Sequence, residues 1–153
     1  MLFLAFELGV NRFALDAACV VEVLPLLEIT RLPQAPPGVA GVSSYHGSPV
    51  PVIDVSALLL GRPAARRLST RLVIVRYQDD RAGVHDLGLM LERATGLARL
   101  DTASFVDSGL TNGRSPYLGR VATDDRGFIQ RVDVHALLPA SVRELLFQAP
   151  VSS

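Results

Sequence analysis

Three histidines and two pairs of adjacent aspartates are the residues of this chain that could do chemistry. A metal site needs three or four clustered ligands, but His46, His85 and His135 are scattered, with no two at ligand spacing. His85-Asp86 supplies two members of a nucleophilic triad, yet no serine lies in the glycine-flanked sequence of a nucleophile elbow. Neighbouring residues on a strand would also point to opposite faces. The histidines therefore predict neither a metal site nor a triad.

The aspartate pairs could share a proton or bind a cation. Asp79-Asp80 and Asp124-Asp125 are each followed by Arg and then, within three residues, by Gly. This order is typical of a solvated hairpin turn. The single cysteine, Cys19, lies in an apolar run and is interpreted as a small core residue. We therefore expect no catalytic residue, no metal and no cofactor.

Composition excludes further classes of function. All 15 basic residues are arginines, so no lysine can form a Schiff base or serve a phosphate-binding loop. They balance 15 acidic residues, and zero net charge argues against a nucleic-acid-binding protein. The apolar start at residues 1–6 is interrupted by Glu7 and is too short for a signal peptide or a membrane span. We expect no membrane insertion, and a cytoplasmic location by default.

The elements that would position these side chains are short apolar runs separated by turn residues. With 153 residues, of which 49% are hydrophobic and 20% charged, the chain can bury a core as one domain. The runs predict an all-β protein. We expect strands at 2–8, 13–15, 18–27, 41–45, 48–53, 70–77, 87–91, 95–100, 118–122 and 128–132. A tight turn is expected at His46-Gly47, a linker at 62–69 and a loop at 101–117.

A short motif occurs twice and suggests two similar modules. Asp54-Val-Ser-Ala-Leu-Leu59 is echoed 79 positions later by Asp133-Val-His-Ala-Leu-Leu138, and each motif predicts a short helix capped by its aspartate. We expect a first barrel over about 1–61, a second over about 70–138, and a helix and tail over 139–153. Residues 1–61 carry a net charge of −3 and residues 62–153 carry +3, which fits a module with two different faces.

Several motifs then follow one another in a characteristic order. They include Phe3-Leu-Ala-Phe6-Glu-Leu-Gly9, Phe13-Ala-Leu, Val20-Val-Glu22-Val23, Gly41-Val42, His46-Gly47 and Pro51-Val-Ile-Asp54-Val. Looser matches follow at residues 70–75, 87–100 and 128–138. In this order the chain resembles a CheW-like domain, the adaptor family of chemotaxis that also forms the regulatory domain of the CheA histidine kinase.

The resemblance implies two intertwined, five-stranded SH3-like barrels with short helices after them, and no catalysis. It implies a scaffold that couples the cytoplasmic tip of a methyl-accepting chemoreceptor to the regulatory domain of a CheA-type kinase, in chemotaxis or in an alternative pathway such as surface sensing. The protein would then be cytoplasmic and associated with receptor arrays. Receptor contact would fall on Val20, Glu22, Val42, His46 and Gly47, and kinase contact on Leu87, Leu89 and Leu91.

One motif departs from the family. Its members typically have Asn-Leu-Arg-Gly at the receptor-contacting turn, whereas this chain has Ser44-Tyr45-His46-Gly47. An arginine offers five donors and a permanent charge, while a neutral imidazole offers one donor. The substitution predicts a receptor that differs from those of ordinary chemotaxis.

Two other classes of function stay open at this point. A small β-barrel hydrolase or ligand-binding protein would use His85, Asp86 or the aspartate pairs, and would show a deep pocket with converging polar groups beside them. A self-associating module would instead pair the edge strands of two copies.

Overall fold

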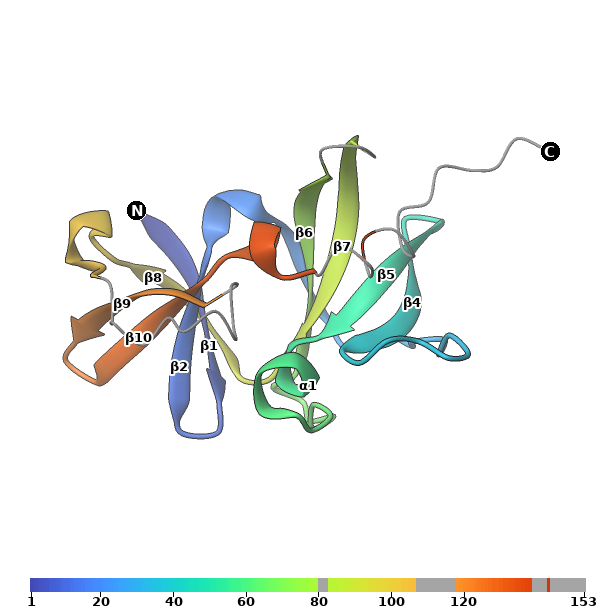
Figure 1. The fold of residues 1–153 in the computed structure, drawn as a ribbon, viewed down its shortest axis with the longest axis horizontal. Helices are drawn as coiled ribbons and strands as arrows, with labels where there is room; N and C mark the ends of the chain where they lie inside the picture. The colour runs from blue at the N-terminus through green and yellow to red at the C-terminus, as the bar shows by residue number, and fades with distance from the viewer. Residues whose placement is uncertain (80–82, 107–117, 139–142, 144–153) are drawn as a thin grey trace.

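The computed structural model of this protein describes residues 1–79, 83–106, 118–138 and residue 143. These residues form ten strands, one α-helix and short 3-10 turns (Figure 1). The strands make two five-stranded sheets that lie side by side along the long axis of the molecule. The predicted all-β class with two five-stranded units is therefore confirmed. The backbone ladders run from one edge strand to the other and do not close either sheet into a ring.

Sheet A combines the first strands of the chain with the last. Its members are β1 (Leu2–Leu8), β2 (Asn11–Asp16), β8 (Ala94–Arg99), β9 (Leu118–Asp124) and β10 (Gly127–Val132). Their spatial order is β8-β1-β2-β10-β9. The pairing of β2 with β10 is parallel, and the other three pairings are antiparallel.

Sheet B is built from the stretch between those two parts. Its members are β3 (Val20–Pro25), β4 (Val39–Tyr45), β5 (Ser48–Asp54), β6 (Arg71–Asp79) and β7 (Gly83–Leu91). Their order is β3-β6-β7-β5-β4, with a parallel pairing between β5 and β7. Strands β3 and β4 are thus the two edges of this sheet.

The division of the chain into 1–61 and 70–138 does not coincide with these sheets. Strands β1 and β2 pair with β8 and β10, so residues before 61 belong to both sheets. Apolar runs mark where strands occur, but they carry no information on which strand is the partner. The two modules are intertwined, as the fold class predicted, and their border is not a point in the sequence.

The core explains why so many strands are apolar on both faces. One cluster lies between the sheets and takes buried side chains from both, among them Leu4, Phe6, Phe13, Val73, Val75 and Leu89. A second cluster, around Phe3 and Ile129, fills the other face of sheet A. A third, around Leu72 and Ile74, does the same for sheet B. Consecutive residues of β6 therefore face two different apolar clusters, which produces a continuous run instead of alternation.

The short helices follow their capping residues. Helix α1 (Val55–Leu60) begins after Asp54, whose carboxylate accepts the Ala57 N–H at 3.1 Å, and it ends at Gly61 with φ of 73°. This helix is confirmed as predicted. After Asp133 only the 3-10 turn η3 (Val134–Ala136) forms, so the second helix is shorter than expected. None of the described helices is long and apolar enough to cross a bilayer.

The strand predicted from residue 18 and the loop predicted at 101–117 differ in part from the structure. The strand expected from residue 18 begins at Val20, because Ala17–Cys19 form the 3-10 turn η1, with the Asp16 carboxylate accepting the Ala18 N–H. In the loop expected at 101–117, the first residues form the 3-10 turn η2 (Thr102–Ser104). Residues 107–117, and the helix and tail expected over 139–153 apart from residue 143, lie outside the described residues.

Candidate interaction surface

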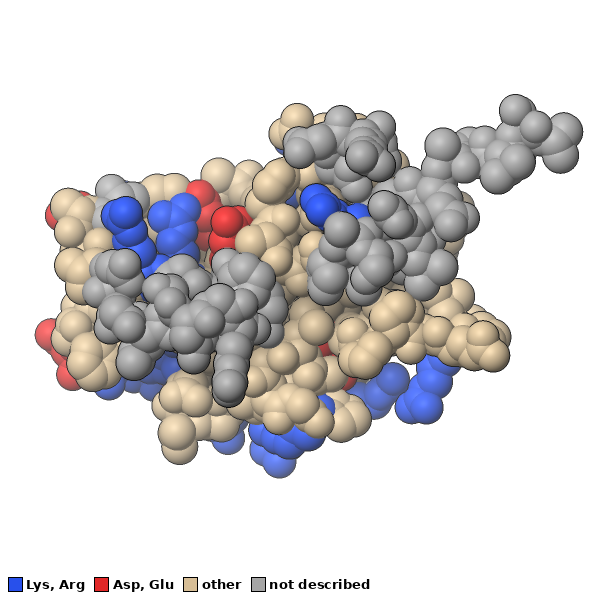
Figure 2. Space-filling model, in the orientation of Figure 1, with Lys and Arg blue, Asp and Glu red and all other residues tan. Residues whose placement is uncertain are grey.

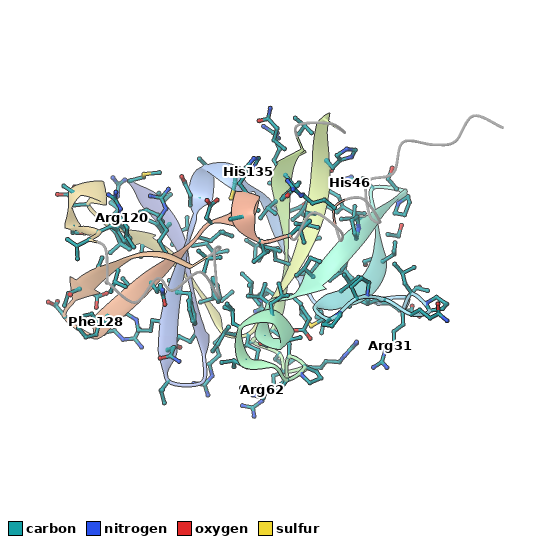
Figure 3. The ribbon with its side chains drawn as sticks, in the orientation of Figure 1. Arg31, His46, Arg62, Arg120, Phe128 and His135 are labelled. Atoms are coloured by element: carbon teal, nitrogen blue, oxygen red, sulfur yellow. The ribbon has the colours of Figure 1, made fainter. Side chains whose placement is uncertain are left out.

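The turn between β4 and β5 presents His46 to solvent. His46 and Gly47 have φ of 50° and 79°, and Tyr45 pairs with Ser48 across them. Two consecutive positive φ values are what a two-residue type I′ hairpin turn requires, and glycine at the second position fits it. The turn predicted at His46-Gly47 is confirmed, and it holds the exposed imidazole at the end of sheet B (Figure 3).

Glu22 on β3 reaches this turn from the opposite edge of the sheet. The Tyr45 hydroxyl donates to Glu22 Oε2 at 2.5 Å, and His46 Nε2 lies 3.7 Å from the same oxygen. The hydrogen bond to Glu22 holds the proton on the phenol and raises the pKa of Tyr45 to about 12. Of the predicted receptor-contacting residues, the structure thus brings Glu22, His46 and Gly47 together. Tyr45, whose hydroxyl bonds to Glu22 and which directly precedes His46, was not among the residues predicted from the sequence.

The other two predicted contact residues are less accessible. Val20 is half-buried and packs against the shared core. Val42 is half-buried, and its N–H and C=O both bond to Thr30 at 2.8 Å, so the segment after β3 covers this edge of β4.

The accessible apolar side chains of β3 are Val21 and Val23, each 43% exposed. The register of β3 against β6 shifts between Val20 and Glu22, which leaves Val21 without a partner opposite it. A bulge cannot be recognised in an apolar run, so which valines face outward could not be predicted from the sequence. We call Val21, Glu22, Val23, Tyr45, His46 and Gly47 the β3 surface.

The predicted kinase-contacting residues require a correction. Leu87, Leu89 and Leu91 are at most 1% exposed and belong to the core cluster between the sheets. Strand β7 is central in sheet B, with β6 on one side and β5 on the other. These leucines stabilise the packing of the two sheets, and in this fold they cannot touch a partner.

The geometry does not favour the hydrolase alternative. A hollow of about 580 Å³ at the seam of the sheets is lined by Asp16, Cys19 and His135 among others, and not by His85 or Asp86. Burial raises the pKa of the Cys19 thiol to about 11, so the thiol keeps its proton at neutral pH. Within the described ranges, no three His, Cys, Asp or Glu residues cluster as metal ligands would.

The two predicted turns at the aspartate pairs lie differently with respect to the described residues. The turn at Asp124-Asp125 is within them, and the turn after Asp79 is not. Asp125-Arg126 forms the turn between β9 and β10, as expected, but Asp124 also accepts two hydrogen bonds from the Arg12 guanidinium at 2.5 and 2.6 Å. This pair links β9 to β2, and it could not be predicted from the sequence because its two residues are 112 positions apart. At the other turn, residues 80–82 lie outside the described residues.

Comparison with known proteins identifies the family. The model of the CheW-like domain matches residues 2–142. The chemotaxis protein CheW of Rhizobium meliloti is 27% identical over 144 residues, covering 92% of this chain and 89% of that protein. CheW of Helicobacter pylori is 27% identical over 81 residues, covering 53% of this chain and about half (49%) of that protein.

The fold agrees with this match. The crystal structure of the scaffolding protein TtCheW from Thermoanaerobacter tengcongensis superposes with a TM-score of 0.80, covering 95% of this chain and 92% of that chain at 21% identity. Two five-stranded sheets around a common core are therefore shared with a solved CheW structure. Because the family match spans nearly all of its sequence, this chain belongs to the CheW-like domain family.

Proposed function

We propose that this protein is a non-catalytic scaffold that couples chemoreceptors to a CheA-type histidine kinase in chemosensory signalling. The observation that carries the proposal is the family match over residues 2–142. The relatives are named as chemotaxis proteins, and the structural neighbour as a scaffolding protein. The protein acts in the cytoplasm, where the tips of membrane receptors and the kinase are both accessible.

The receptor-facing site in this proposal is the β3 surface. Two exposed valines supply apolar area that a receptor helix can bury, and Glu22 with His46 supplies polar groups at its rim. An apolar centre with a polar rim is the usual composition of a protein interface. His46 in place of the family's arginine is the position at which this scaffold selects a different receptor.

A kinase-facing site is proposed on sheet A, since the leucines of β7 are buried. Leu97 on β8 is 64% exposed and Phe128 on β10 is 74% exposed. Phe128 lies at the left end of the view in Figure 3, on sheet A, whereas His46 lies on the upper side of sheet B. A scaffold that holds two proteins at once needs surfaces separated in this way.

The test is calorimetric titration of the protein with a receptor-tip fragment and, separately, with a kinase regulatory domain encoded beside it. Val23→Arg is expected to weaken receptor binding about tenfold or more, because it places a charge in an apolar contact. Kinase binding should be unchanged. Val10→Arg, in the turn between β1 and β2, is the matched control because Val10 is 98% exposed on the other sheet.

Phe128→Ala should give the reverse pattern, with weaker kinase binding and unchanged receptor binding. If the unaltered protein bound neither partner, the scaffold function would be wrong. If Val23→Arg and Val10→Arg bound the receptor tip with equal affinity, the scaffold function could still be correct, but the β3 surface would not be the receptor site.

A further inference from the structure

A second hollow, of about 440 Å³, lies in sheet B apart from the β3 surface. Residues 31–40, which are the loop before β4 and the first two residues of that strand, line it together with the segment at residues 63–66. Met90 adds a buried apolar side chain, and Leu32 and Val39 are half-buried beside it. None of the six residues of the β3 surface lines this hollow. We call it the arginine hollow, because Arg31 and Arg66 line it from its two segments.

The cations of the arginine hollow have no carboxylate partner in the part of the chain that the structure describes. Arg31 and Arg66 are exposed, and neither forms an ion pair there. Arg67 is a further exposed arginine beside Arg66 in the sequence. Figure 2 shows arginine side chains projecting along this lower edge of the molecule. Arg31 and Arg62 lie on that edge, away from His46 (Figure 3).

The carboxylate that lines the hollow, Asp54, and that of Glu92 beside the segment at residues 63–66 are already engaged. Asp54 is 8% exposed, and its two oxygens accept the N–H groups of Ala57 and Ala64 at 3.1 and 2.9 Å. Glu92 accepts from the Ser56 hydroxyl and the Ala65 N–H and pairs with Arg62 at 3.3 Å. Burial alone would raise the pKa of Glu92, but these donors lower it overall, so Glu92 stays ionised. The exposed charge of the hollow is therefore positive.

The loop that forms one wall is held in place before any ligand arrives. Pro33, Pro36 and Pro37 fix φ at three of the ten positions in residues 31–40. The Gly38 carbonyl accepts the Asp54 N–H at 2.8 Å, and a Cβ at Gly38 would lie 2.3 Å from Leu58 of α1. Little conformational entropy is lost when a ligand binds such a wall.

We propose that the arginine hollow binds an acidic segment of a partner protein, with carboxylates on Arg31 and Arg66 and an apolar side chain between them. Arginine forms bidentate hydrogen bonds with carboxylates. A concave site with apolar walls fits a peptide better than the surface of a membrane or a duplex, and zero net charge gives no general attraction to phosphate. The hollow is separate from the β3 surface, so both can be occupied at once.

The test is fluorescence anisotropy of a short labelled peptide rich in glutamate with two leucines, and of its copy with glutamine for every glutamate. We expect the acidic peptide to bind and the glutamine copy not to bind. Arg31→Gln and Arg66→Gln should each weaken binding about tenfold, the cost of one charged hydrogen-bonded contact. Arg99→Gln, which removes a charge that is also exposed, from β8, should leave the affinity unchanged.

Four results would overturn the proposal. The first two are that the acidic peptide does not bind, and that Arg99→Gln loses as much affinity for it as Arg31→Gln does. The third is that the protein binds only vesicles of phosphatidylglycerol or RNA. The fourth is that the protein self-associates and that Arg31→Gln removes this self-association. Receptor-tip binding measured on Arg31→Gln should match that of the unaltered protein. The failure of the arginine hollow is thereby distinguishable from a failure of the scaffold function.

Discussion

Gly41 lies where two backbones approach more closely than a side chain would permit. Its φ is +146°, and a Cβ there would lie 2.1 Å from the Thr30 carbonyl oxygen. The next residue, Val42, pairs with Thr30 through two hydrogen bonds. This one glycine allows the segment after β3 to lie against β4, and so to cover an edge of sheet B.

Gly41→Ala is therefore expected to lower the free energy of unfolding by about 3 kcal/mol or more, through a steric clash and backbone strain together. Gly47→Ala is the matched control. Gly47 also has positive φ, but no atom of the described residues lies within 4 Å of its Cβ position. Gly47→Ala should lower the free energy of unfolding by only about 1 kcal/mol, through backbone strain alone. Urea unfolding followed by circular dichroism measures both, and equal losses would contradict the close approach.

The pair of Arg12 and Asp124 makes stability depend on pH. The hydrogen bonds from Arg12 lower the pKa of Asp124 from its ordinary 3.8 to about 2. A carboxylate whose pKa is lower in the folded state than in the unfolded state stabilises the fold when the pH is above its unfolded-state pKa. This contribution is lost as the pH falls through the folded-state pKa. Because the pair is partly exposed, its contribution is about 1 kcal/mol at most. We expect this part of the stability to disappear between about pH 4 and pH 2.

The measurement is the urea midpoint as a function of pH. Asp124→Asn should have a lower urea midpoint than the unaltered protein at neutral pH, and the two midpoints should become equal in acid. Asp125→Asn alters the neighbouring, exposed carboxylate of the same turn and leaves the pair of Arg12 and Asp124 in place, so the loss of stability in acid should remain. A constant difference between Asp124→Asn and the unaltered protein at every pH would rule out the ion pair as the cause.

At the scale of elements, local signals predicted what they control directly. Asp54 and Gly61 marked both ends of α1, and His46-Gly47 marked the turn before β5. The same local motif at Asp133 gave only a 3-10 turn, since a helix needs tertiary packing as well as a cap. Strand partners and the outward face of β3 could not be predicted, because they depend on contacts between distant residues and on a bulge.

The two capping aspartates offer a test of how much each short helix contributes. Asp54→Ala should cost about 2 kcal/mol, the upper part of the range for a cap, because Asp54 is buried and holds two N–H groups. Asp133→Ala should cost about 0.5 kcal/mol, since Asp133 is exposed and, among the described residues, accepts a hydrogen bond only from the His135 N–H. Thermal unfolding of the two variants gives the comparison. Equal losses would mean that the buried position of Asp54 adds nothing.

At the scale of the whole molecule, one core joins the two sheets. Leu89 is in that core, so Leu89→Ala should lower the free energy of unfolding by about 2–5 kcal/mol. Amide hydrogen exchange should show that strands of both sheets lose protection together, although Leu89 lies only in sheet B. Loss confined to β5, β6 and β7 would mean that the sheets are separate folding units. Val84→Ala, an exposed change on the same strand, is the control.

The interleaving of the sheets also has a consequence for protein synthesis. Every strand of sheet B comes from residues 20–91, whereas sheet A needs residues 2–16 and residues 94–132. On the ribosome, sheet B is complete before sheet A can be. Strands β1 and β2 leave the exit tunnel before the other strands as an apolar hairpin, and their sheet is completed only after residues 94–132 have emerged. During that interval the hairpin is the segment that a chaperone would bind.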